Sequence, residues 1–392
     1  MFSMDWNKIT NISGFKDITT LSGANIISTI IGGLFWFYIA SLVGEEGYGE
    51  ISYYLSIATI GSVVAMIGAS NSLVVYAAKG EKILPVISFI TLILSAIAAF
   101  IIFLIFFNIG ASLHLFTYVI FGLITAEIIG KKLYQLYSKY VITQKILMVI
   151  FAILLYYLIG DNGILIGISF SFLLLIIPLY NMCKNTKINF GALKPKRNFL
   201  INNYVLDLSR TFGWSLDKII IVPMFGFAIL GNYQLGLQFY TVFLLFPSII
   251  YQYILPQDAS GTPNVLLKKI TIIGSVGIAI MGIIFSPIFV PMIFPEFNEA
   301  IIIIQIMSLG VIPGTINYVY ISKFLGELRS KIVLLGSGLY LGTIIIGIIV
   351  LGGVFDVNGL AMAFVLAGTV ESIFLTSISK FEKRKQMDED IS

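Results

Sequence analysis

The chain has 392 residues, of which 58% are hydrophobic and 11% are charged, and its mean hydropathy is +0.98. Soluble domains contain roughly 25% charged residues, so this composition excludes a string of soluble domains and indicates a protein with many membrane spans. The net charge of +4 is scattered over short loops, which argues against nucleic acid as a partner, and one cysteine and one histidine leave neither a disulfide nor a metal cluster, so we expect no metal and no cofactor.

Apolar runs separated by charged or glycine-rich breaks predict twelve membrane-spanning helices, because a helix needs roughly 20 residues to cross the hydrocarbon. The first six are expected at residues 21–43, 51–77, 83–108, 112–129, 141–160 and 163–181. The second six are expected at residues 203–225, 229–255, 268–292, 301–325, 331–352 and 358–379. The predicted fold is therefore all-α and integral to the membrane.

A polar and basic linker at about residues 182–199 separates the two sets of six spans. We interpret it as the hinge between an N-terminal lobe, residues 1–190, and a C-terminal lobe, residues 191–392. The alternative is a simple positive anchor, or a contact for anionic lipid headgroups, with no further function.

The charges of the loops predict the orientation of the chain, because Lys and Arg accumulate in cytoplasmic loops. With the N-terminus inside, every Lys and Arg between spans falls on the inner side. The charged residues of the outer loops are all acidic: Glu45, Glu46, Glu50, Asp161, Glu296, Glu299 and Asp356. We therefore expect a multi-pass protein of the cell membrane with both termini in the cytoplasm.

Two local matches suggest that the halves are repeats, as in many transporters. The first outer loop places Gly44 and Gly49 five residues apart before a span, and Gly226 and Gly231 repeat this spacing after span seven. The last outer loops match as well, with DNG at 161–163 and DVNG at 356–359. Six spans return the chain to the same side, so the repeats are parallel and the lobes pseudo-symmetric.

The same segments resemble oligosaccharide flippases of the Wzx type. The resemblance is carried by SGANIISTIIGGLFWFYIASLVGEEGYGEISYY within residues 15–57, by LDKIIIVPMFGFAILGNYQLGLQF at 216–239 and by NGLAMAFVLAG at 358–368. It implies two six-helix lobes around a central cavity, and export of a polyprenyl-diphosphate-linked oligosaccharide from the cytoplasmic to the outer leaflet. The implied partners are this lipid-linked substrate, the bilayer and other polysaccharide-assembly proteins.

Two relatives within the same superfamily fit the sequence less well. Lipid II flippases, by resemblance, carry two extra C-terminal spans and an arginine-rich first lobe. Cation-coupled drug exporters often carry a carboxylate in the first span. This chain has twelve predicted spans, no arginine in a first-lobe span and no carboxylate in span one, which favours the oligosaccharide branch.

Span seven is the most polar span and supplies the main candidate site. At 100° per residue its four charges and one tryptophan fall within an arc of about 100°. We expect substrate contact from this face: Asp207, Arg210, Trp214, Asp217 and Lys218. Arg210 and Lys218 would hold the diphosphate, since guanidinium and ammonium groups bind phosphate oxygens. The alternative is internal neutralisation, because the four charges sum to zero.

Neutral polar stripes add further candidates for contact with a hydroxyl-rich glycan. Asn25 lies in such a stripe on span one, and Gln234 and Gln238 lie on one face of span eight. The alternative is that these residues only pack helices together. Glu127, Lys323 and Glu371 stand out as lone ionisable side chains, and we expect Glu127 and Glu371 to be candidates for ion coupling.

The sequence contains no nucleophile motif, Walker-type loop or paired catalytic carboxylates, so we expect no enzymatic activity and no catalytic residue. Two rival functions stay open. One is a cation-coupled antiporter of small molecules or drugs from the same superfamily. The other is a membrane-embedded enzyme acting on glycans, which the very short outer loops disfavour.

Overall fold

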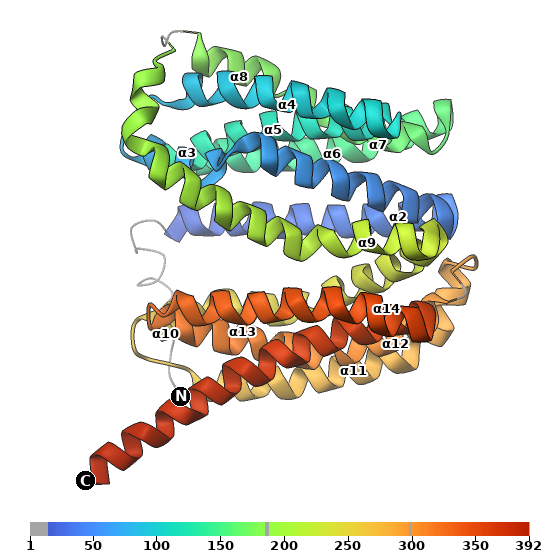
Figure 1. Cartoon of the computed structure of the whole chain (residues 1–392), viewed down its shortest axis with the longest axis vertical. Helices are drawn as coiled ribbons and strands as arrows, with labels where there is room; N and C mark the ends of the chain where they lie inside the picture. Colours follow the sequence, from blue (N-terminus) through green and yellow to red (C-terminus); the bar gives the residue numbers. More distant parts are fainter. Residues whose placement is uncertain (1–14, 185–187, 298, 392) are drawn as a thin grey trace. The chain divides into compact units, whose positions relative to one another are not determined.

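The computed structural model describes residues 15–184, 188–297 and 299–391, and these residues are overwhelmingly helical (Figure 1). Part of the predicted linker, residues 185–187, lies outside the described residues. The helices in the first half of the chain are α2 (Phe15–Met66), α3 (Ala69–Ala78), α4 (Leu84–Phe106), α5 (Ile109–Gly130), α6 (Tyr134–Ile159), α7 (Asn162–Leu173) and α8 (Ile176–Cys183). The second half contains η1 (Phe190–Lys196), α9 (Arg197–Phe243), α10 (Leu245–Ala259), α11 (Val265–Ile293), α12 (Ala300–Leu309), α13 (Val311–Gly326) and α14 (Ser330–Ile391).

Within the described ranges, nine helical stretches are long and apolar enough to cross a membrane. Three of them, in α2, α9 and α14, contain one residue with non-helical backbone angles, at Gly44, Gly226 and Asp356. Each of these residues divides its stretch into two spans, so nine stretches provide twelve. The predicted all-α membrane fold with twelve spans is thus confirmed.

The chain forms two compact units. The first comprises Met1–Trp36 and Tyr53–Leu216, and the second comprises Phe37–Ser52 and Asp217–Ser392. Both boundaries of the short inserted segment fall inside α2, and the last boundary falls inside α9. The division into lobes at residues 1–190 and 191–392 stays a prediction. The units are defined by packing, whereas the lobes are defined by the number of spans.

The first unit is built around α5, which packs against α3, α4 and α7. Its core contains fully buried side chains from these elements, among them Leu73, Ile83, Leu123, Ile124 and Ile128. In contrast, the outward faces of the same unit are strongly apolar, as Phe100 at 61% and Ile105 at 63% exposure on α4 illustrate. An apolar outer surface of this kind is suited to hydrocarbon and not to water.

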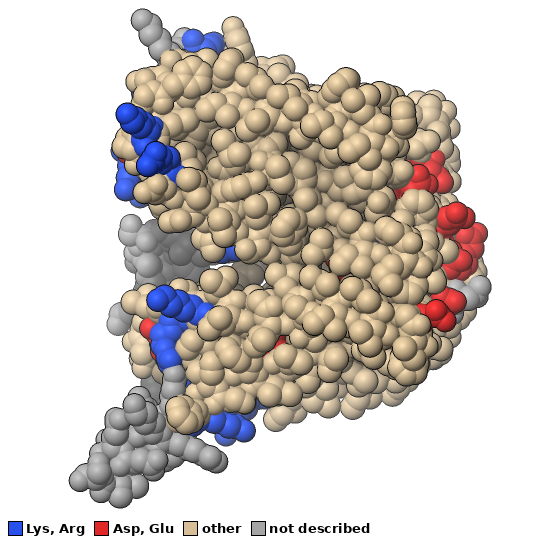
Figure 2. Space-filling model, viewed as in Figure 1, with Lys and Arg blue, Asp and Glu red and all other residues tan. Residues whose placement is uncertain are grey.

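The second unit is organised in the same way. Helices α12 and α13 pack against α11 and α14, and α10 packs against α13. Ile303, Ile304 and Leu360 are buried in its interior, while Ile273 on α11 is 70% exposed. In each unit taken by itself, Lys and Arg gather at one end of the helices, and the larger groups of Asp and Glu lie at the other (Figure 2). This separation of charge is what the positive-inside rule requires of a spanning protein.

The two glycine-rich turns predicted as repeats have the same conformation. Gly44 (φ 70°, ψ −175°) and Gly226 (φ 85°, ψ 178°) both occupy a region of backbone space that is open almost only to glycine. The turns also contact each other within the second unit, and the contact is reciprocal. A side chain at Gly49 would overlap the carbonyl oxygen of Phe227, and one at Gly231 would overlap the carbonyl oxygen of Glu45.

The second predicted match is present as well. A side chain at Gly163 would overlap the carbonyl oxygen of Leu155, and one at Gly359 would overlap that of Leu351. Each glycine therefore packs on the backbone eight residues before it, across the turn that joins two spans. The two local matches that the sequence predicts therefore also match in their glycine contacts.

Candidate functional site

Helix α9 carries the four charges that the sequence assigns to span seven, and it is helical up to the turn at Gly226. Asp207 and Arg210 belong to the first unit, and Asp217 and Lys218 belong to the second.

In the first unit, Asp207 is held by helix α3, because the Nδ2 group of Asn71 donates to its Oδ1 atom at 3.0 Å. Arg210 is exposed, interacts electrostatically with Asp207 and forms no ion pair with the described residues. Trp214, one turn further along, is 69% exposed. Arg210 lies seven residues after Asn203, where the predicted span begins, which corresponds to about 10 Å along the span.

That depth decides what Arg210 can face. A charge near the membrane centre costs roughly 2.5 to 3.5 kcal/mol on insertion scales, so it faces protein, water or a ligand in preference to lipid. Because Arg210 is exposed in the folded chain, it does not face protein, and we therefore expect it to face water or a ligand. Its guanidinium group offers paired donors to a phosphate.

In the second unit, Asp217 and Lys218 neutralise each other. The Nζ atom of Lys218 lies 3.2 Å from Oδ1 of Asp217, and the backbone N–H of Lys218 donates to the same oxygen at 2.9 Å. The hydroxyl of Tyr233 donates to Oδ2 at 3.1 Å. Lys218 is only 8% exposed. This pair fits the alternative of internal neutralisation better than the Arg210 region does.

The polar face of span one lies against α6. The hydroxyl of Tyr137 donates to Oδ1 of Asn25 at 3.1 Å, although Asn25 itself is largely exposed. In span eight, Gln234 and Gln238 are both half-buried. Asn25 thus has the helix-packing role that the alternative describes, and its exposure also leaves it accessible.

The two candidate ion-coupling carboxylates have different surroundings. Glu127 is buried and its Oε1 atom lies 2.7 Å from Nζ of Lys131, so its interpretation as a lone group is wrong. Glu371 is also buried, and its Oε2 atom accepts a hydrogen bond from Nδ2 of Asn317 at 3.0 Å. Among the described residues no Lys or Arg forms an ion pair with Glu371.

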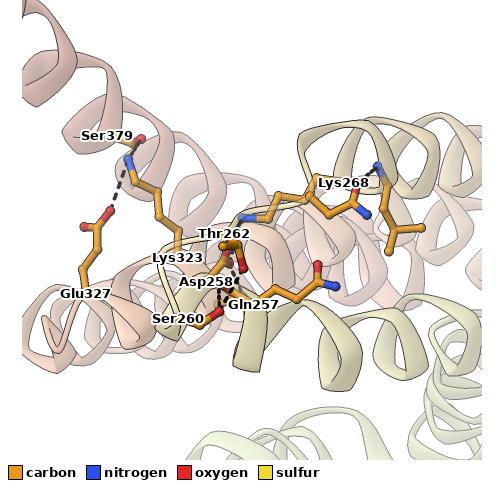
Figure 3. Close-up of polar contacts among 11 residues, drawn as sticks. Gln257, Asp258, Ser260, Thr262, Lys268, Lys323, Glu327 and Ser379 are labelled. Carbon is orange, nitrogen blue, oxygen red and sulfur yellow. Dashed lines mark hydrogen bonds and ion pairs between the residues drawn. The ribbon is translucent and has the colours of Figure 1, made fainter. Parts of the chain in front are cut away.

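The sequence reasoning missed two features. The first is a largely buried ion pair at the basic end of the second unit, where Nζ of Lys268 lies 2.6 and 2.7 Å from the two oxygens of Asp258 (Figure 3). The hydroxyl of Ser322 donates to the same carboxylate at 2.6 Å, so one carboxylate joins α10, α11 and α13. Nearby, Nζ of Lys323 donates to Ser379 at 2.7 Å and lies 3.8 Å from Oε1 of Glu327, so Lys323 is not a lone charge.

The second missed feature is Lys145, in the middle of α6. Its position as the one charged residue of the predicted span 141–160 was the available signal. It has no charged neighbour three or four residues away on its own helix.

Comparison with known proteins identifies the fold. No family model matches the sequence, and no curated protein matches it significantly. Among solved structures, the lipid II flippase MurJ in an inward closed conformation has a TM-score of 0.71 at 15% identity, covering 92% of this chain and 87% of that chain. A multidrug resistance MATE family transporter of the MOP superfamily, inward-facing, has a TM-score of 0.70 at 13% identity, covering 94% and 99%.

A third structure is a MOP superfamily transporter from Pyrococcus furiosus, described as having a binding pocket of reversed polarity. Its TM-score is 0.59 at 12% identity, and the match covers 94% of this chain and 95% of that chain. Sequence identities this low carry information about the fold alone. The chain is a multi-pass membrane protein with the fold of the MOP superfamily transporters.

Proposed function

We propose that the protein moves a polyprenyl-diphosphate-linked oligosaccharide from the cytoplasmic to the outer leaflet by alternating access. The observation that carries this proposal is Arg210, an exposed arginine about 10 Å inside the predicted span 203–225. An exposed guanidinium at that depth needs an anionic or aqueous partner, and the diphosphate of the substrate provides one. Exposed Trp214, one turn away, offers an apolar ring face to a sugar.

Support also comes from the fold, since one structural neighbour is a flippase of lipid II. The remaining predicted contacts stay candidates within this proposal: Asn25, Asp207, Asp217, Lys218, Gln234 and Gln238. Lys218 would bind an anion only after separating from Asp217, whereas Arg210 needs no such rearrangement.

The test is leaflet exposure of a fluorescent polyprenyl-diphosphate oligosaccharide in vesicles that contain the purified protein. We expect the protein to accelerate crossing and Arg210→Ala to reduce the rate by about tenfold or more, the loss typical of a charge-assisted hydrogen bond. Arg197→Ala is the matched control, because Arg197 is exposed at the start of the same helix. The Arg210 assignment fails if both variants transport equally, and the function fails if the unmodified protein does not accelerate crossing.

The second candidate function is cation-coupled export of small molecules. It is favoured by buried Glu371, which lacks a basic partner among the described residues, and by the MATE transporters among the structural neighbours. Uptake of a soluble cationic dye driven by a sodium or proton gradient would support it. The expected result is no such uptake, because the exposed charge on span seven is positive.

A further inference from the structure

Lys145 lies in the membrane-spanning part of the first unit, far from both ends of its helix. It is 11 residues after Tyr134 and 14 residues before Ile159, which corresponds to about 17 Å and 21 Å along α6. Lys145 also lies inside the predicted span 141–160, and its ammonium group lies against Met148 and beside Gly32 of α2 instead of extending away from the protein. The charge of Lys145 is therefore held within the protein.

The ammonium group has few polar neighbours. Its Nζ atom lies 3.9 Å from the sulfur of Met148, and a side-chain carbon built at Gly32 of α2 would lie 3.8 Å from it. Lys145 forms no ion pair with the residues that the structure describes. The titratable group that interacts with it electrostatically is His114, which can add positive charge but not negative charge.

The other buried or half-buried lysines of the described chain are neutralised. The Nζ atom lies 2.6 Å from Glu81 in Lys196, 3.2 Å from Asp217 in Lys218, 2.6 Å from Asp258 in Lys268 and 3.8 Å from Glu327 in Lys323. The fold therefore supplies a carboxylate to each of these cations. Lys145 is left without one.

The surroundings of Lys145 are suited to a polar ligand. Its side chain is partly buried but not sealed, and Gly32 leaves space beside the ammonium group. Further along the same α2–α6 contact, Asn25 meets the Tyr137 hydroxyl at 3.1 Å, and the Ser138 hydroxyl donates to the backbone of Thr20 at 3.1 Å. These neutral groups can bind hydroxyls without cancelling the charge.

We propose that Lys145 binds a phosphate group of the diphosphate in the lipid-linked substrate, so that the substrate supplies the counter-ion that the chain lacks. This inference rests on the proposed function and adds a phosphate contact in the first unit that is independent of Arg210. An ammonium group acts on phosphate as a point charge. Arginine at the same position should therefore preserve binding, and an uncharged side chain of similar length should not.

The experiment measures binding of farnesyl diphosphate to the purified full-length protein in detergent. Lys145→Met should weaken binding by about tenfold or more, as expected for a charge-assisted hydrogen bond. Lys145→Arg should bind as the unmodified protein does. Lys139→Met is the matched control, because Lys139 is exposed six residues earlier on the same helix, and it should have no effect.

Two further probes identify the source of the phosphate. Inorganic pyrophosphate should bind more weakly than farnesyl diphosphate, and phosphatidylglycerol should not compete. Equal affinity for pyrophosphate, or competition by phosphatidylglycerol, would overturn the assignment to a lipid-linked diphosphate. The melting temperature of Lys145→Met should not fall, since the change removes a charge that has no partner in the chain.

The inference is wrong if Lys145→Met binds farnesyl diphosphate as tightly as the unmodified protein. It is also wrong if binding and melting temperature fall together and Lys145→Arg restores neither, because Lys145 would then be structural. Its failure differs from that of the proposed function. A protein that accelerates no lipid crossing, yet binds farnesyl diphosphate through Lys145, would lose the proposed function and keep the site.

Discussion

Replacing Gly49 with alanine should separate the two glycine-rich turns in the second unit. The added methyl group would overlap the carbonyl oxygen of Phe227 and lie 2.8 Å from the amide nitrogen of Gly231. Overpacking costs about 1 to 3 kcal/mol, and we expect the upper end because both obstacles are backbone atoms that cannot rotate away. A cost of about 3 kcal/mol shifts the equilibrium between closed and separated turns by roughly 100-fold.

The labelling rate of a buried cysteine measures that equilibrium. Asn232 is 1% exposed and its Nδ2 atom donates to Oε2 of Glu45 at 2.5 Å, so Asn232→Cys is protected while the turns are in contact. In a Cys183→Ser background, Gly49→Ala should accelerate maleimide labelling of this cysteine by about 100-fold, since labelling follows the open population.

Gly277→Ala is the matched control, because nothing lies within 4 Å of a side chain built at Gly277 on α11. It should leave the labelling rate unchanged. Gly231→Ala should reproduce the effect of Gly49→Ala. The free-energy cost of the double variant should be smaller than the sum of the two single costs, since both changes break the same contact between the turns. Equal labelling of the Gly49→Ala and Gly277→Ala proteins would refute the reasoning.

Three further changes test other parts of the structure. Asp258→Ala leaves the largely buried Lys268 without its carboxylate and should lower the free energy of unfolding by about 3 kcal/mol in a denaturant titration. A loss below about 1 kcal/mol would contradict a structural role. Glu371→Gln retains an acceptor for Asn317 but removes the ionisable group. Transport should therefore lose its response to an imposed ion gradient. An unchanged response would exclude Glu371 from ion coupling. Asn108→Ala removes the side-chain acceptor for the first turn of α5 and should cost about 1 kcal/mol, measured by the same titration, with no change expected if the cap is unimportant.

Most of the fold follows from hydrophobic run length. The run predicted at 83–108 is α4 (Leu84–Phe106), and the run predicted at 112–129 is α5 (Ile109–Gly130). The bilayer requires long apolar helices with satisfied backbone groups, so the pattern is strong and largely insensitive to tertiary packing. The glycine-rich turns are equally predictable from the sequence, because few residues other than glycine can adopt the backbone angles found at Gly44 and Gly226.

The candidate site was less predictable, because it depends on partners that are distant in sequence. Helical spacing places Asp217 and Arg210 on one face, but it does not reveal that Tyr233 and Lys218 occupy the oxygens of Asp217. It also does not show that Lys145 lacks a carboxylate. The pairing of Glu127 with Lys131 was within reach, since residues four apart are neighbours on a helix.

The way the units divide the chain has a consequence for biosynthesis. The first unit needs residues up to 216, which lie beyond the six spans of the N-terminal half, and the second unit needs residues 37–52, which are made near the start. A ribosome that has released only the first half has therefore completed neither unit. Segment 37–52 is synthesised early but can pack into its unit only after the later spans have been synthesised. Folding of the second unit therefore depends on both ends of the chain.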